Sequence, residues 1–189
     1  MKKKTFDNEE ARKVDLLDLL TKYGISLTEF PYEWLCTTEY FTSPASTKYH
    51  AAYPGGLYDH CRNMTDVLLH LTNKGITVPW SRPESPVIVG MLHDITKVGK
   101  YKELYPEARM DYPAYEYIGA LDYGGHGSDS LIKVLQHMRL TEEESMCIRY
   151  HMGAYEQADW KNMDKAIKKY PNVLWTHVAD MVASKLMED

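Results

Sequence analysis

The chain has 189 residues, of which 44% are hydrophobic, and a formal net charge of -5 at pH 7. This length and apolar content suit one sizeable core, so we expect one domain over residues 1–189. No stretch reaches the roughly 18 to 20 apolar residues of a membrane span. An acidic helix start follows the basic residues 2–4, so no signal peptide is expected. The negative charge and the lack of a long basic run make duplex nucleic acid an unexpected partner.

The three cysteines, Cys36, Cys61 and Cys147, are scattered along the chain and show no C-x-x-C spacing. This pattern argues against a disulfide framework and against a thiolate zinc site. A cytoplasmic location, with its reducing environment, fits the pattern best.

Helix start and stop signals recur along the first quarter of the chain, which favours an all-α fold. Asp7 with Glu10 predicts the start of a first helix, and Gly24 predicts its end. Ser26 with Glu29 has the spacing of a capping box and predicts a second helix.

A longer helix is predicted from the glycine pair at residues 55–56 to Lys74, with Gly75 as its stop. His60 lies beside the apolar stripe of this helix. The stripe has helical spacing and consists of Leu57, Cys61, Met64, Leu68 and Leu71.

Ser85 and Pro86 predict the start of a buried helix that runs into His93 and Asp94. A long Tyr- and Gly-rich loop follows over residues 101–125, with room for a short hairpin near the site. Loops of this length inside a domain are more often functional than accidental.

Three further helices are predicted toward the end of the chain. Ser128 starts the first, Thr141 with Glu144 caps the second, which carries His151, and Asn172 caps the last.

Six candidate metal ligands fall at the ends of successive predicted helices, each about one helix and one connection from the next. Such spacing lets side chains from separate helices converge on one point. Imidazole with carboxylate suits Mn, Fe, Co, Ni or Zn, whereas calcium and magnesium prefer oxygen ligands. A buried helix that ends in an ionisable pair is costly unless a charge compensates it, and a metal ion does so. The six candidates are His60, His93, Asp94, His126, His151 and Asp180.

Five segments together resemble the HD-domain metal-dependent phosphohydrolase superfamily, which implies an all-α HD-domain helical bundle. They are YHAAYPGGLYDH (49–60), MLHDITK (91–97), GHG (125–127), IRYHMG (148–153) and HVAD (177–180). The resemblance is strongest over residues 46–186, and residues 1–45 are expected to pack on that domain as helices. Within the superfamily, the first segment is similar to the HD domain of certain bacterial 3′→5′ exoribonucleases. The compact size and the fourth segment are similar to small hydrolases of dinucleoside tetraphosphates.

The resemblance implies two divalent transition-metal ions and a water activated by them. One ion would be bound by His60, His93, Asp94 and Asp180. The other would be bound by His126 and His151, with Asp94 as the bridge.

Asp94 and Lys97 are the candidate catalytic residues. Lys97, which is expected one turn after His93 on the same helix face, can hold a phosphate oxygen, or it can be an ordinary surface lysine. The candidate substrate contacts are His50, Arg62, Arg149 and His177.

The leading hypothesis is a hydrolase that cleaves a phosphate ester or anhydride of a nucleotide or a related small phosphate compound. HD-fold diiron oxygenases, which act on a small polyol or phosphonate, use the same kind of ligand set and remain an alternative. A non-catalytic module that senses nucleotides is a second alternative.

Overall fold

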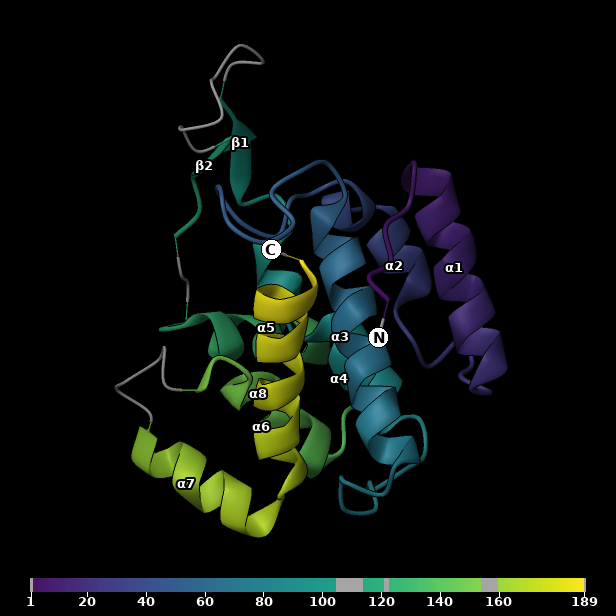
Figure 1. Ribbon diagram of the computed structural model, residues 1–189, viewed down its shortest axis with the longest axis vertical. Coiled ribbons are helices and arrows are strands. Elements are labelled where there is room, and N and C mark those ends of the chain that lie inside the picture. The colour runs from purple at the N-terminus through teal and green to yellow at the C-terminus, as the bar shows by residue number, and fades with distance from the viewer. Residues whose placement is uncertain (1, 105–113, 121–122, 154–159, 189) are drawn as a thin grey trace.

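A computed structural model describes residues 2–104, 114–120, 123–153 and 160–188, and these residues are mostly helical (Figure 1). The all-α expectation is confirmed. Within the described residues the α-helices are α1 (Glu9–Lys22), α2 (Tyr32–Cys36), α3 (Gly56–Asn73), α4 (Ser85–Leu92), α5 (His126–Leu135), α6 (Glu142–Tyr150), α7 (Trp160–Lys169) and α8 (Asn172–Val182).

A short antiparallel hairpin lies in the Tyr-rich loop, as the sequence allowed. Its strands are β1 (Tyr101–Glu103) and β2 (Tyr115–Tyr117), with Tyr101 opposite Tyr117. Residues 105–113 and 121–122 of the predicted loop lie outside the described residues. Three shorter helical segments complete the described elements: the 3-10 turns η1 (Glu39–Phe41) and η2 (Ile95–Lys97), and the π-helical segment η5 (Ala183–Met187).

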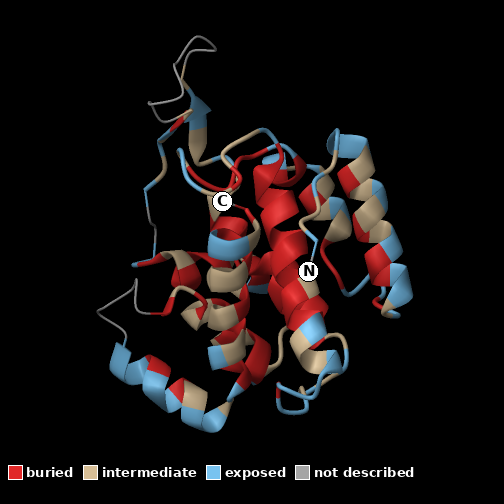
Figure 2. Cartoon of the chain, viewed as in Figure 1, coloured by how far each residue is buried: buried red, intermediate tan, exposed pale blue. Residues whose placement is uncertain are grey.

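Helix α3 is the central element of the fold. In Figure 1, α1 and α2 lie on one side of it and α8 on the other, and Figure 2 shows α3 buried along most of its length. Four members of its predicted apolar stripe are fully buried, and Leu71 packs against the same core. The predicted stripe therefore faces the core, and His60 beside it is fully buried as well.

The polar side of α3 is also buried, because the start of the chain covers it. The guanidinium of Arg12 donates from Nε to Asp59 Oδ1 over 2.8 Å, and both side chains are almost inaccessible. The side chain of Asn63 accepts from the backbone N–H of Lys4 at 2.7 Å and donates to its carbonyl oxygen at 3.1 Å. Paired charges and satisfied amides keep the cost of burying these groups low.

Helices α3 and α4 approach each other closely at Gly90. A Cβ atom at this position would lie 2.2 Å from Thr65 Oγ1 and 2.8 Å from the Cα of Thr65. Glycine is therefore needed for the contact, because the backbone of α3 occupies the space of a side chain. The approach brings the rings of His60 and His93 to a centroid distance of 5.3 Å.

Three predicted helix starts are wrong in position. Asn172 is the first residue of α8 and does not cap it, since Pro171 is the N-cap and the amide of Asn172 pairs with Val78 and Glu143. The cap of α1 is Asn8, whose side chain accepts from the N–H of Ala11 at 2.9 Å, in place of Asp7. Helix α5 begins at His126, two residues before the predicted Ser128.

The helix predicted from Ser26 and Glu29 does not form there. Ser26 Oγ instead accepts from the backbone N–H of Thr28 at 3.2 Å, which closes a local turn. Serine side chains often form such local hydrogen bonds to the backbone in turns, and these compete with helix formation. The next helix, α2, starts only at Tyr32, after Pro31.

The end of α4 also differs from the expectation. The helix stops at Leu92, with His93 as its C-cap, and Lys97 ends the separate 3-10 turn η2. Lys97 therefore does not continue the helix of His93, although both remain close to Asp94.

In the described ranges we find no helix that combines the length and the apolarity needed to span a membrane.

We expect Gly90→Ala to lower the free energy of unfolding. Alanine favours a helix over glycine by about 1 kcal/mol, but overpacking against a fixed backbone costs about 1–3 kcal/mol, so a net loss of up to about 2 kcal/mol should remain. Chemical denaturation measures this difference.

Gly119→Ala is the matched control, because the three heavy atoms nearest to an added Cβ there all belong to the side chain of Lys100, which can move aside. Its effect should stay within about 0.5 kcal/mol. Equal stabilities of the two variants would contradict the proposed close contact at Gly90.

Candidate metal centre

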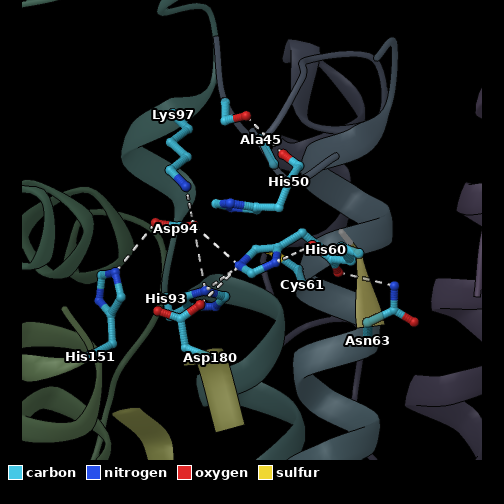
Figure 3. Close-up of polar contacts among 12 residues, drawn as sticks. Ala45, His50, His60, Cys61, Asn63, His93, Asp94, Lys97, His151 and Asp180 are labelled. Atoms are coloured by element: carbon cyan, nitrogen blue, oxygen red, sulfur yellow. Dashed lines mark hydrogen bonds and ion pairs between the residues drawn. The ribbon is translucent and has the colours of Figure 1, made fainter. Parts of the chain in front are cut away.

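Five of the six predicted ligands come together at one buried point. His60 comes from the first turns of α3, His93 and Asp94 follow α4, His151 follows α6, and Asp180 lies on α8. Figure 3 shows these side chains converging from the separate helices on the carboxylate of Asp94.

The first group of ligand atoms surrounds Asp94 Oδ2. His60 Nε2 lies 3.6 Å from this oxygen and His93 Nε2 lies 3.5 Å from it. Asp180 Oδ1 is 3.2 Å from His60 Nε2. Two imidazoles and two carboxylates therefore face one small volume, which can hold a metal ion.

The second oxygen of Asp94 faces a different imidazole. Asp94 Oδ1 lies 3.3 Å from His151 Nε2. His93, Asp94 and His151 form a second compact group of ligand atoms beside that of His60, His93 and Asp180, so His93 is common to both groups. Asp94 lies between them, with Oδ2 facing His60 and His93 and Oδ1 facing His151. One carboxylate can in this way contact two neighbouring ions.

Each of the three imidazoles is oriented by a hydrogen bond from its outer nitrogen. His93 Nδ1 donates to the carbonyl oxygen of Gly90 at 2.9 Å, and His151 Nδ1 donates to that of Ile148 at 2.7 Å. His60 Nδ1 donates to Glu188 Oε2 at 2.9 Å. These acceptors have no proton to give, so each Nδ1 carries its proton, and each Nε2 faces Asp94 or its surroundings, where it can hold a second proton or a metal ion.

This arrangement requires a positive charge between the rings. His60 Nε2 and His93 Nε2 are only 3.3 Å apart, and two lone pairs at that distance repel each other. A proton or a metal ion between them removes the repulsion, and both are held by the same atoms. The donor set, with imidazole nitrogens and carboxylate oxygens mixed, fits a first-row divalent ion.

The ionisation of the histidines follows from this crowding. Burial disfavours charge on His60, but the carboxylates of Glu188 and Asp180 outweigh it and raise the pKa of His60 to about 10. Burial lowers the pKa of His93 to about 4, and the nearby imidazoles support that shift against the attraction of Asp94.

The carboxylates stay ionised. Burial alone would raise the pKa of Asp94, but Lys97 and His93 hold it well below its usual range. Burial likewise opposes the ionisation of Asp180, yet its contact with His60 lowers the pKa of Asp180. The buried anionic groups thus provide the charge that a divalent ion neutralises.

Lys97 makes a close ion pair with the central carboxylate. Its Nζ lies 2.7 Å from Asp94 Oδ2, and the side chain is 11% exposed. Burial disfavours the ammonium, but Asp94 raises the pKa of Lys97 above its usual value, so the group stays charged. Because of this contact, Lys97 is not an ordinary solvated surface lysine.

A cavity of about 160 Å³ opens beside this cluster. Its wall contains positive charge from Lys97 and Lys185 and apolar surface from two methionines. The lining residues are His50, Asp94, Lys97, Met152, His177, Asp180, Met181, Ser184 and Lys185.

Two of the predicted substrate contacts line this cavity. The ring of His50 lies 4.9 Å from that of His60, and burial together with the charges of His60 and Lys97 lowers the pKa of His50 to about 3. His177 Nδ1 donates to the carbonyl oxygen of His151 at 2.8 Å and so also supports the turn that presents His151.

The two predicted arginines are not among the residues that line the cavity. Arg62 is buried and paired with Asp15 at 2.8 Å and with Asp66, so it joins α3 to α1. Arg149 donates to Ser128 Oγ and lies over the ring of Tyr150. Both guanidinium groups have structural partners, which the sequence pattern did not show.

His126 is the predicted ligand that the structure does not bring into the cluster. It is the first residue of α5, and its ring lies 6.2 Å from that of Tyr117. Among the described residues, the groups of ligand atoms within 4.8 Å of one another do not include it. Its role as a ligand stays a prediction.

Glu188 belongs to the site and was missed in the sequence. It is 7% exposed and contacts His60 directly. No spacing rule marks a glutamate that follows a helix as the partner of a histidine 128 residues earlier.

Comparison with protein-family models, curated proteins and solved structures found no match for this chain. The geometry and chemistry of the cluster are therefore the basis for any functional proposal.

We expect the wild type to bind two metal ions per chain and His151→Ala to bind one. The imidazole of His151 faces only Oδ1 of Asp94, so the group formed with His60 and Asp180 stays intact. Asp94→Ala should lose both ions, because one oxygen of its carboxylate faces His60 and His93 and the other faces His151. Elemental analysis of dialysed protein gives the stoichiometry.

His126→Ala provides the comparison within the same experiment. A fall to one ion would support His126 as a ligand, and an unchanged content would exclude it. Two ions retained at native affinity in His151→Ala would contradict the second metal position.

Proposed function

We propose that this chain is a metal-dependent phosphohydrolase of the HD-domain type, which cleaves a phosphate ester or anhydride of a nucleotide or a related small phosphate compound. The observation that carries the proposal is the convergence of three imidazole Nε2 atoms on the two oxygens of one buried, ionised carboxylate. The order of these residues along the chain is that of the HD-domain pattern.

Two divalent ions held at this point would activate a water molecule for attack on phosphorus and would stabilise charge on the phosphoryl oxygens. Asp94 would offer one oxygen to each position, and Asp180 with His60 and His93 would complete the first. Because the chain's own hydrogen bonds already orient the rings, little reorganisation is needed when the ligands bind metal.

The cavity supports an anionic substrate. The ammonium of Lys97 lies in its wall beside Asp94, and Lys185 adds a second positive charge that is exposed to solvent. His50 and His177 provide ring nitrogens on the same wall. A phosphate group with oxygens directed at Lys97 would lie next to both metal positions, which is the geometry that hydrolysis requires.

The size of the cavity limits what enters it. At about 160 Å³ it is smaller than the roughly 300–1,000 Å³ of ordinary ligand pockets. We infer that the scissile phosphate and its nearest atoms occupy it, while the rest of the substrate lies at the rim near Lys185. A phosphorylated compound with a compact reacting end fits this description.

Metal analysis of the purified protein followed by a substrate screen tests the proposal. The screen should cover mono-, di- and triphosphate nucleotides, dinucleotides and a chromogenic phosphodiester, assayed without oxygen in the presence of manganese. Release of phosphate or a nucleotide under these conditions is the expected result.

Two outcomes would contradict the hydrolase. Bound iron with oxygen consumption on a polyol or phosphonate would indicate the diiron oxygenase instead. Tight nucleotide binding without turnover would indicate a sensing module.

We expect Lys97→Ala to reduce kcat/KM about tenfold to a thousandfold on a phosphate substrate. The range corresponds to the loss of one charged contact to the transition state, at about 1.4 kcal/mol per decade. Metal content should not fall, because an ammonium cannot be a metal ligand and its removal takes a positive charge away from Asp94.

Lys168→Ala is the control, since that ammonium pairs with Asp164 on the surface and its side chain is 74% exposed. It should leave kcat/KM unchanged. Full efficiency in Lys97→Ala would restrict Lys97 to a structural ion pair with Asp94.

A further inference from the structure

The carboxylate of Glu188 binds the outer nitrogen of His60. Its Oε2 accepts from His60 Nδ1 at 2.9 Å, and both side chains are buried, with the ring of His60 wholly inaccessible. His93 and His151 use backbone carbonyl oxygens for the same purpose. Of the three imidazoles, His60 is thus the one whose Nδ1 donates to a negatively charged group.

A second contact fixes the position of this carboxylate. Glu188 Oε1 accepts from Asn63 Nδ2 at 3.1 Å. Asn63 lies one turn after His60 on α3, and its amide is itself held by the backbone of Lys4. Each oxygen of the Glu188 carboxylate therefore accepts a hydrogen bond from a side chain of helix α3, one from His60 and one from Asn63.

We propose that Glu188, held by Asn63, is a positioning residue that fixes the orientation and tautomer of His60 and strengthens it as a metal ligand. The inference rests on the proposed function, because it concerns the first metal position. A carboxylate on the far nitrogen makes an imidazole more basic at the near one and restricts its rotation, and loss of such a partner typically costs 10- to 100-fold in metal affinity.

The geometry argues against Glu188 as a ligand of its own. Ligand atoms of His50, His60 and Glu188 do lie within 4.8 Å of one another. However, the His60 nitrogen that contacts Glu188 is Nδ1, which gives its proton to Glu188 and has no lone pair left for a metal. Glu188 therefore acts through His60.

Two substitutions separate the charge of Glu188 from its hydrogen bond. Glu188→Gln keeps an oxygen that accepts from His60 Nδ1 but removes the negative charge, and Glu188→Ala removes both. Zn²⁺ affinity is measured by competition with a chromogenic chelator, and the ring nitrogens of His60 are observed by ¹H–¹⁵N NMR. Glu142→Gln is the matched control, because it removes a surface carboxylate that pairs with Lys169.

We expect affinity at the first position to fall about tenfold in Glu188→Gln and up to about 100-fold in Glu188→Ala. The number of ions bound at saturation should stay the same. In the metal-free protein, the proton on His60 Nδ1 should persist in Glu188→Gln and be shared between the two ring nitrogens in Glu188→Ala. Glu142→Gln should match the wild type in every measurement.

Asn63→Ala gives a test that does not depend on the stability of the Glu188 variants. It leaves the carboxylate in place but removes one of its two supports, so a smaller loss of affinity is expected. Circular dichroism of the metal-free variants checks that they are folded.

Two results would overturn the inference. The first is wild-type Zn²⁺ affinity in both Glu188→Ala and Asn63→Ala. The second is the complete loss of one ion in Glu188→Ala, which would make Glu188 a ligand. Neither result affects the hydrolase proposal if the wild type binds metal and releases phosphate. A wild-type chain that binds no metal would overturn both proposals.

Discussion

The buried carboxylate of Asp94 is the group on which the rest of this structure depends. It is 2% exposed and ionised, and a charge removed from water is costly unless other charges and hydrogen bonds surround it. Lys97 at 2.7 Å and three imidazoles within 3.6 Å provide that surrounding. Since these groups belong to four separate segments, the helices must meet at Asp94 for the charge to be tolerated. The same demand makes the cluster a candidate metal centre.

The packing of the helices meets this demand through two features of α3. Its apolar stripe fills the core, and its polar side is covered by the start of the chain through the pair of Arg12 with Asp59. With both sides buried, α3 is a fixed support for His60. Gly90 then allows α4 to approach until His60 and His93 face each other. The distance between the nitrogens is thus set by backbone packing, which is stiffer than any side chain.

The sequence predicted those features that are encoded locally. The apolar spacing of α3, the capping box of Thr141 with Glu144 and the histidine and aspartate pattern all depend on neighbouring residues. Features that depend on distant contacts were missed or wrongly assigned. The sequence suggests Arg62 as a phosphate contact, but the structure pairs it with Asp15. No sequence pattern marks Glu188 as the partner of His60. Helix α7 was overlooked because its buried side contains little more than Met163 and Ala166.

Under the proposed function, the two metal positions are unequal for electrostatic reasons. The first is bordered by Asp94 Oδ2 and Asp180, and its imidazole His60 is backed by the charge of Glu188. The second has Asp94 Oδ1 and His151, whose outer nitrogen meets only a neutral carbonyl. Negative charge attracts a divalent ion more strongly than neutral donors do, so the first position should fill before the second. Asp94 would couple them, because its two oxygens share one negative charge. Turnover would then depend on occupancy of the weaker position, while Asp94 and Asp180 of the first position line the cavity that contains Lys97 and His177.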